Sequence, residues 1–277
     1  MKPAHHFRHE AMNTTFHIRF AEASADAAFI ARDCFDVIDF LEDRLSRYRQ
    51  DSDITRINLL PAGETLYITP ETHQCLLRSI ELYQQTAGLF DITLGQRIRH
   101  RKDGHDGPPP ELQGQIVIHP DEPAVTCVEP GRELDLGGIG KGFALDFLGE
   151  KLEEWEAPPM LLSAGASTHL TWGDAAWPIR LESAKAARVV ELKNGALSAS
   201  GTEIQGSHIV HPDAGGLLVE GRVWVVANCA TTADAWTTAL ILCPREETHG
   251  FVNGASGIRE VIRQAAGTMP SPQKTDR

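Results

Sequence analysis

The chain has 277 residues, which is room for one large hydrophobic core or two modest ones. Its composition, 42% hydrophobic and 23% charged, is that of an ordinary soluble globular protein. The formal net charge of −12 excludes broad binding to nucleic acid, so a phosphate-bearing ligand must be held by local devices such as glycines, helix ends or a metal ion.

Cysteine usage and the N-terminal residues bear on the cellular compartment. The five cysteines are far apart and form no CxxC pair, so we expect reduced thiols rather than disulfides or a zinc site. The first residues, MKPAHHFRHEAMNTTF, lack the apolar run of a signal peptide or lipoprotein leader, and no stretch is long and apolar enough to span a membrane. We therefore expect a cytoplasmic protein, or a periplasmic one if a leader has been removed.

The N-terminal part predicts a strand, a long helix and a loop. Apolar and polar residues alternate over 14–20, which favours a half-buried strand. Over 25–45 apolar residues recur at helical spacing, and Ser24 is placed to cap that helix. The polar stretch LSRYRQDSDITRIN, residues 45–58, is typical of a loop.

A second helix is predicted to begin at Thr69-Pro70-Glu71, which combines a cap residue, a proline in the first turn and an acid beside the positive helix end. Gly88 marks the end of this helix. Residues 101–114, RKDGHDGPPPELQG, are polar and rich in Pro and Gly, and are predicted to be a mobile loop or lid. Strands are expected next at 115–118 and 124–128.

The most informative stretch is LDLGGIGKGFALD, residues 134–146, where an apolar strand ends in glycines and a helix is predicted from Lys141. Glycines let a ligand approach the backbone closely, and a helix N-terminus points N–H groups at an anion. Asp135 could accept hydrogen bonds from a base or ribose, and Lys141 suits a phosphate. The stretch matches neither the P-loop nor the dinucleotide fingerprint, so a nucleotide cradle and a plain glycine-rich turn both remain open.

The second half predicts strands followed by one more helix. The strands are expected at 160–163, 168–172, 177–182, 189–192 and 223–227, and the helix at 231–242. Runs of strands and separate helices, without a regular strand–helix alternation, predict an α+β fold rather than a doubly wound sheet. We expect a single domain over residues 11–250, with flexible termini at 1–10 and 267–277.

Two positions in the second half could carry chemistry. Asp234 and Thr238 are four residues apart in the predicted helix and share one face, where their oxygens suit Mg²⁺. The alternative is an aspartate stabilised by the helix dipole and a threonine bonded to the helix backbone. His208 lies in a turn before Pro212 and, with a solution pKa near 6.5, could accept a proton at neutral pH. The N-terminal histidines His5, His6 and His9 are expected to be structural or simply solvated.

Seven segments follow one another in a distinctive order along the chain. They are Met12-Asn13-Thr14, LSRYRQDSDITRIN, TAGLFDITLGQ, LDLGGIGKGFALD, LLSAGA, SASG…SHIVHPDAG and ADAWTTALIL. In this set and order the chain resembles the ApbE family, the FAD:protein FMN transferases, over roughly residues 11–243.

The resemblance implies an α+β, ApbE-like flavin-binding fold with mixed or antiparallel sheets flanked by helices. It implies a Mg²⁺-dependent transfer of FMN from FAD to a Thr or Ser hydroxyl of an acceptor flavoprotein, with release of AMP. An FAD pyrophosphatase, which would yield FMN and AMP, and a non-catalytic flavin-binding protein are the alternatives. No nucleic-acid partner is expected.

Matching motif positions also carries residue roles to this chain. The residues that would contact flavin or nucleotide are Met12, Tyr48, Gly88, Leu89, Phe90, Asp135 and Lys141. The metal would be held by Asp234, Thr238 and the backbone carbonyl of Gly138, and His208 would sit beside the reacting phosphate as the catalytic base.

The chain departs from the usual family pattern at three places. Asn13 replaces a glycine, and Ser198 or Ala199 stands where a threonine is common. Thr202-Glu203-Ile204 stands where an aromatic and arginine pair is common. These departures concern acceptor recognition and the flavin contact more than the metal site.

Overall fold

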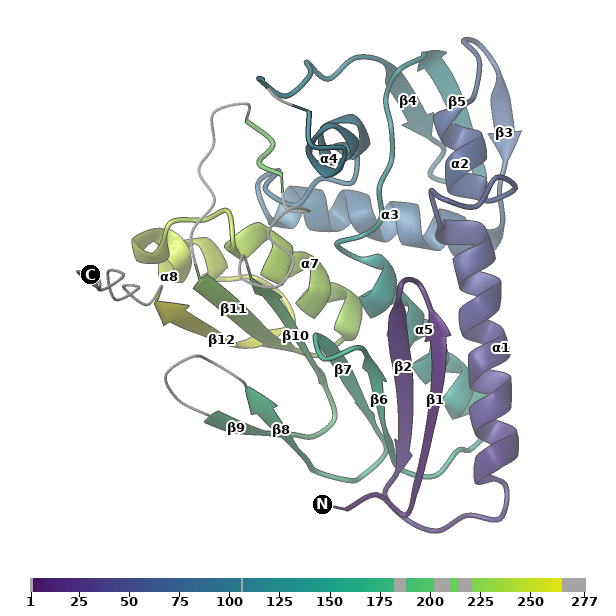
Figure 1. The fold of residues 1–277 in the computed structure, drawn as a ribbon, viewed down its shortest axis with the longest axis vertical. Helices are drawn as coiled ribbons and strands as arrows, with labels where there is room; N and C mark the ends of the chain where they lie inside the picture. The colour runs from purple at the N-terminus through teal and green to yellow at the C-terminus, as the bar shows by residue number, and fades with distance from the viewer. Residues whose placement is uncertain (1, 106, 182–187, 202–209, 214–220, 266–277) are drawn as a thin grey trace, which may run out of the picture.

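The computed structural model describes residues 2–105, 107–181, 188–201, 210–213 and 221–265. It contains three antiparallel sheets, with strand orders β1-β2-β6-β7-β10-β11-β12, β3-β5-β4 and β8-β9 (Figure 1). The α+β class with antiparallel sheets flanked by helices, which the sequence predicts, is confirmed.

The strands of the large sheet are β1 (His5–Ala11), β2 (Thr14–Phe20), β6 (Met160–Ala164), β7 (Thr168–Trp172), β10 (Ala196–Gly201), β11 (Gly221–Ala227) and β12 (Ile258–Ala265). The smaller sheets consist of β3 (Thr65–Tyr67), β4 (Gln115–Ile118), β5 (Ala124–Glu129), β8 (Trp177–Leu181) and β9 (Arg188–Leu192). The helices are α1 (Ala27–Leu45), α2 (Asp53–Asn58), α3 (Pro70–Gln85), α4 (Gly95–Lys102), α5 (Gly140–Glu154), α7 (Ala230–Leu240), the 3₁₀ turn η1 (Arg245–Glu247) and α8 (Thr248–Val252).

Helices α1, α5 and α7 pack against one face of the large sheet, and the β8–β9 hairpin packs against the other (Figure 1). Successive side chains of strand β11 point to opposite faces of the sheet, so this one strand contributes to the hydrophobic cores on both faces. Val223 and Val225 lie in the core under the helices, whereas Trp224 and Val226 lie in the smaller core under the hairpin. The sheet is therefore buried on both faces along β10 and β11.

The position of α7 is set by a carboxylate from α5. Asp146 accepts hydrogen bonds from the backbone N–H groups of Ala230 and Thr231, both at 2.7 Å. It thereby caps the N-terminus of α7, whose own cap residue Cys229 makes no side-chain cap. Burial raises the pKa of Asp146, while these donors oppose the rise. This cap fixes α7 against α5.

Helix starts with strong local signals form as predicted. Thr69 caps α3 by accepting a hydrogen bond from the Thr72 N–H, with Pro70 in the first turn. Helix α5 covers the range predicted after the glycines. The α1 start differs: Asp26 is its cap residue without a side-chain bond, and Ser24 instead accepts from the Asp26 N–H.

The structure also contains elements where the sequence predicts none. Strand β1 begins at residue 5, inside the predicted flexible terminus 1–10, and β12 lies beyond residue 250, so the large sheet extends past both predicted domain bounds. The predicted loop 45–58 contains α2, capped by Ser52. Helix α4 includes the first two residues of the predicted loop 101–114. The remaining described residues of that loop form no helix or strand.

Two further sequence expectations can be compared with the described residues. All five cysteines are free, and four of them are buried. Among the helices described, none combines the length and the hydropathy that crossing a bilayer requires.

Candidate functional site

One cavity of about 1590 Å³ lies where the β1–β2 turn, the glycine turn before α5 and the face of α7 meet. Of the residues predicted for the site, its lining includes Met12, Tyr48, Leu89, Phe90, Asp135, Gly138, Lys141, Asp234 and Thr238. Folding thus brings together segments that are far apart in the sequence. The predicted base His208 lies outside the described residues, and Gly88 is not part of the lining.

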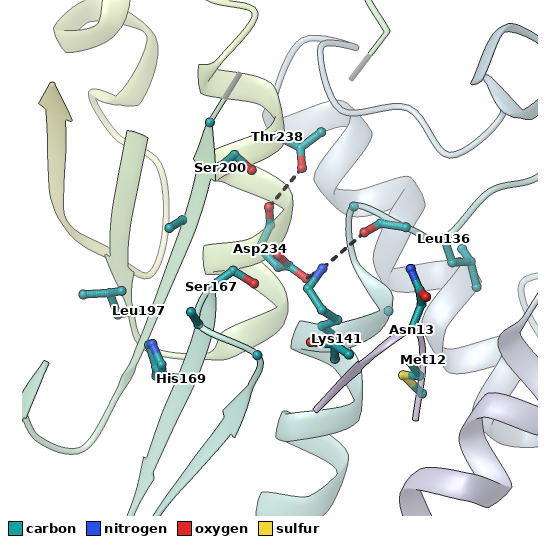
Figure 2. Close-up of a pocket in the computed structure, with 18 of the residues that line it drawn as sticks. Met12, Asn13, Leu136, Lys141, Ser167, His169, Leu197, Ser200, Asp234 and Thr238 are labelled. Carbon is teal, nitrogen blue, oxygen red and sulfur yellow. Dashed lines mark hydrogen bonds and ion pairs between the residues drawn. The ribbon is translucent and has the colours of Figure 1, made fainter. Parts of the chain in front are cut away.

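Asp234 on α7 is the acid at the centre of the site, and its side chain is almost fully buried (Figure 2). Its Oδ1 accepts hydrogen bonds from Ser198 Oγ at 3.0 Å and Thr168 Oγ1 at 3.4 Å. Its Oδ2 accepts from the Gly142 N–H at 3.1 Å and lies 3.7 Å from Lys141 Nζ. Neutral donors thus hold the carboxylate in place, and one oxygen faces a cation.

Thr238 and the glycine turn adjoin Asp234, as the predicted metal site requires. A Cβ added to Gly138 would lie 3.1 Å from Thr238 Oγ1 and 3.3 Å from the Phe90 ring, so the glycine permits a close approach. Thr238 Oγ1 also donates to the backbone carbonyl of Asp234 at 3.3 Å, which is the alternative bond that the sequence left open.

The space between the glycine turn and α7 favours positive charge. Lys141 Nζ lies there, donating to the Gly137 carbonyl at 3.5 Å while facing the Asp234 carboxylate (Figure 2). Asp234, Thr238 and the backbone of Gly138 are oxygen donors of the kind that Mg²⁺ prefers, with few protein ligands. The described residues contain no group of three or more His, Cys, Asp or Glu placed to hold a metal, so a metal site here would depend on this mixed oxygen set.

Asp135 stabilises the glycine turn. Its Oδ1 accepts from the Gly137 N–H at 2.8 Å and its Oδ2 from Arg47 Nη1 at 3.0 Å. Arg47 also bonds Glu133 Oε2 at 2.9 Å and the Gly95 carbonyl at 3.1 Å. Both carboxylate oxygens of Asp135 therefore already have a protein donor, whereas the sequence pattern predicts that they face a ligand. Contact with a nucleotide stays a prediction.

The β1–β2 turn brings a strained backbone to the cavity wall. Met12 and Asn13 have φ values of 49° and 56°, the positive φ pair of a type I′ hairpin turn. Methionine is unusual in this left-handed region, and such strain is concentrated at functional sites. The conformation holds Met12 partly buried against the core at the cavity edge.

Tyr48, Leu89 and Phe90 form other parts of the wall. Tyr48 is 71% exposed, and its hydroxyl accepts from Lys102 Nζ at 2.6 Å. Gly88 has φ +82° and lies against the Tyr83 ring, so it shapes the turn behind Leu89 rather than facing the cavity. Phe90 is buried, and its N–H donates to Thr86 Oγ1 at 3.1 Å.

Sequence reasoning missed the residues that support the site. Ser198 and Thr168 hold Asp234, Arg47 holds Asp135, and Asp146 caps α7. In the sequence Ser198 stands out only as a departure from a family pattern, and nothing local links it to a carboxylate 36 residues away. Arg47 lies in the polar stretch predicted to be a loop, where a buried ion pair leaves no periodic signal.

The family model described as the ApbE family matches residues 12–262 of the chain. The FAD:protein FMN transferase of Vibrio cholerae is 23% identical over 285 residues, covering 88% of this chain and 84% of the relative. The enzyme of the same name from Escherichia coli is 24% identical over 250 residues, covering 78% of this chain and 71% of the relative.

Solved structures share the architecture. The flavin transferase ApbE from Vibrio cholerae aligns with a TM-score of 0.79 at 21% identity, covering 93% of this chain and 92% of that one. The ApbE protein of Thermotoga maritima aligns with a TM-score of 0.80 at 22% identity, covering 94% and 93%. At these identities the structural match demonstrates a common fold.

Proposed function

The chain belongs to the ApbE family, and from this premise we propose that it transfers FMN from FAD to a Thr or Ser hydroxyl of an acceptor flavoprotein, releasing AMP. The relatives that carry the name FAD:protein FMN transferase support the reaction class. The observation that supports it most in this chain is the buried Asp234 beside the glycine turn at the cavity wall.

The proposed reaction exchanges the phosphoanhydride link of FAD for a phosphoester link to the acceptor. The acceptor oxygen forms a bond to the phosphorus on the FMN side of FAD, the bond from that phosphorus to the bridging oxygen breaks, and AMP leaves with that oxygen. The hydroxyl proton passes to a base. His208 is the predicted base, on sequence grounds alone.

The residues of the site would position and neutralise the diphosphate. Lys141 Nζ lies at the cavity wall, where it can pair with a phosphate oxygen. The turn at Gly137–Gly140 lets the diphosphate approach the backbone closely. Phe90 and Met12 supply an apolar wall for the flavin ring.

Mg²⁺ is part of the proposal because the donor set fits it. Asp234, Thr238 and the Gly138 carbonyl would hold the ion, which would neutralise diphosphate oxygens and the charge that grows on the leaving AMP. Ser198 and Thr168 would keep the Asp234 carboxylate aimed at that position.

The test is to incubate the protein with FAD and Mg²⁺, with and without a candidate acceptor flavoprotein, and to measure AMP and flavin-labelled acceptor. AMP release that requires the acceptor supports the transferase. Release without acceptor would instead show an FAD pyrophosphatase, and no release under either condition would show a flavin-binding protein without turnover.

A matched pair of variants tests the role of Asp234. Asp234→Asn keeps the size of the side chain but removes its charge, so we expect AMP release to be abolished and Mg²⁺ no longer to strengthen FAD binding. Asp174→Asn removes an equal charge from a side chain that is 84% exposed, and should behave as wild type. Normal turnover in Asp234→Asn would overturn the metal assignment.

A further inference from the structure

The outer face of the large sheet, on the side away from the helices, carries a cluster of polar and basic side chains. The strand register sets His17 on β2 opposite Ser163 on β6, and Ser163 opposite His169 on β7. Arg19 lies two residues beyond His17, on the same face. Figure 2 shows His169 and Leu197 on the opposite side of the strands from Asp234. We call His17, Arg19, Ser163 and His169 the basic trough.

Ser163 links the trough residues. Its Oγ accepts from Arg19 Nη1 at 3.1 Å and lies 2.9 Å from His169 Nδ1. Burial, together with the charge of Arg19, lowers the pKa of His169 to about 4, so this ring is neutral at pH 7. Arg19 remains as the charged group at the centre of the trough.

Arg19 lacks an acidic partner within the part of the chain that the structure describes. No carboxylate there lies within ion-pair distance of its guanidinium, although its side chain is half-buried and burial lowers its pKa. A partly desolvated cation costs free energy unless an anion compensates it. The trough is therefore built to receive a negative group.

The basic trough belongs to the same cavity as the Asp234 site. The lining continues past His17, Arg19 and His169 to the apolar side chains of Trp177 and Leu197. Among the described lining residues on β2, β7, β8, β10 and β11, there are arginines but no Asp or Glu. A basic and apolar arm is unexpected in a chain with a net charge of −12.

The size of the cavity leaves room for a second ligand beside a nucleotide. Cavities for one small molecule typically measure about 300–1,000 Å³. This cavity measures about 1590 Å³. The nucleotide residues lie at the glycine turn and α7, so the arm on the outer sheet face is available to whatever meets the nucleotide there.

We propose that the basic trough binds a carboxylate side chain of the acceptor protein, beside the hydroxyl that receives FMN. The inference rests on the proposed function and names what the enzyme recognises in its acceptor. Arg19 presents a planar fork of donors that matches a carboxylate, and Trp177 and Leu197 offer an apolar wall to the neighbouring acceptor residue.

The test compares two acetylated, amidated peptides, ELTL and QLTL, which differ by one carboxylate. Their affinities for the FAD-free protein are measured by isothermal titration calorimetry. A charge-assisted hydrogen bond contributes about 1.5–3 kcal/mol, so we expect ELTL to bind at least about tenfold more tightly. Equal affinities, or no binding of either peptide, would overturn the proposal.

Variants of Arg19 connect that preference to the trough. Arg19→Gln should bind both peptides equally while keeping wild-type affinity for FAD with Mg²⁺, and Arg19→Lys should retain part of the preference because it keeps the charge. Arg188→Gln, which removes an exposed charge on β9 outside the cavity, should keep the full preference. A preference that survives in Arg19→Gln would exclude the trough as the site.

Two further arms separate this inference from the proposed function and from a phosphate site. Inorganic phosphate that displaces ELTL more strongly than acetate does would show a phosphate site and overturn the carboxylate assignment. An Arg19-dependent peptide preference without FMN transfer to any acceptor would uphold the trough and refute the transferase. FMN transfer without that preference would do the reverse.

Discussion

Three buried or nearly buried aspartates show how the same residue type serves structure or site. Asp53 accepts from the Thr69 N–H and from the Thr72 hydroxyl, and so ties α2 to the start of α3. Asp146 uses both oxygens to cap α7. Asp234 is the one of the three that lines the cavity and faces a lysine. Burial alone does not distinguish these roles, whereas the direction each carboxylate faces does.

At the same scale, His169 makes stability depend on pH. Its pKa is about 4 in the folded protein and 6.5 in the unfolded chain, so between these values the unfolded state binds more protons. Its contribution to stability is complete above pH 6.5 and is lost as the pH falls toward 4. The pKa values of His6 and His17 are lowered too, which adds to the same trend.

We predict that His169→Gln flattens the pH dependence of unfolding between pH 7 and 4.5. Over the full titration of His169, the free energy of unfolding of the wild type should fall by up to about 3 kcal/mol more than that of the variant. Each unit of pKa shift corresponds to about 1.4 kcal/mol. Urea unfolding at a series of pH values measures the difference. Parallel curves for the two proteins would show that His169 titrates normally in the folded state.

At the scale of elements, the contact between α5 and α7 positions the site. Gly142 allows the two helices to touch, because a Cβ there would lie 2.4 Å from the Ala230 carbonyl oxygen and 2.9 Å from Asp234 Cβ. The Gly142 N–H also donates to Asp234. The helix pair and the orientation of the Asp234 carboxylate therefore depend on the same glycine.

Gly142→Ala is expected to force the helices apart and to lower the free energy of unfolding by about 3 kcal/mol, the upper end for overpacking because backbone atoms are in the way. Gly140→Ala is the matched control, because an added Cβ there meets nothing within 4 Å and alanine favours the helix. Chemical unfolding of both variants measures the difference in their free energies of unfolding. If Gly142→Ala were as stable as Gly140→Ala, the close helix contact would be refuted.

The elements that could be predicted from the sequence carry their own local signals. Thr69 and Pro70 start α3, and the glycines before Lys141 start α5. Strand β12 gave no such signal, because Val261 packs into the core under the helices while the adjacent Ile262 packs under the hairpin. A strand with apolar contacts on both faces loses the alternation that identifies it.

Strand β1 was missed for a different reason. Its inward face carries His9, which bonds Asp39 Oδ1 at 2.7 Å and stacks on Phe35 of α1, where an aliphatic residue would have been recognised. His9 is therefore a structural histidine, one of the two roles expected for the N-terminal histidines. Polar residues on an inward face are satisfied by tertiary partners that sequence periodicity cannot reveal.

At the scale of the whole molecule, the site is assembled from long-range pairs. Arg47 reaches Asp135 across 88 residues, and Gly142 reaches Asp234 across 92. Most of the residues that the family resemblance assigns to the site line one cavity, because a family pattern encodes such distant contacts indirectly. The residues that support the site and the residues of the basic trough depend on strand register and helix contacts. These can be identified only once the fold is known.

The edge of the large sheet gives the last prediction. Strand β1 pairs with β2 along its full length, and Phe7 lies edge-on to Phe20, with ring centroids 6.0 Å apart. Deleting residues 1–10 would leave β2 as an unpaired edge beside the cavity and break the turn that holds Met12. We expect the truncated protein to lose several kcal/mol of stability, to aggregate more readily and to bind FAD more weakly, as measured by urea unfolding, light scattering and flavin titration.

Deletion of residues 267–277, predicted to be a flexible tail, is the control and should change none of these. If the two truncations behaved alike, β1 would be the dispensable terminus that the sequence first indicated, and the β1–β2 turn would not be needed to shape the flavin end of the cavity.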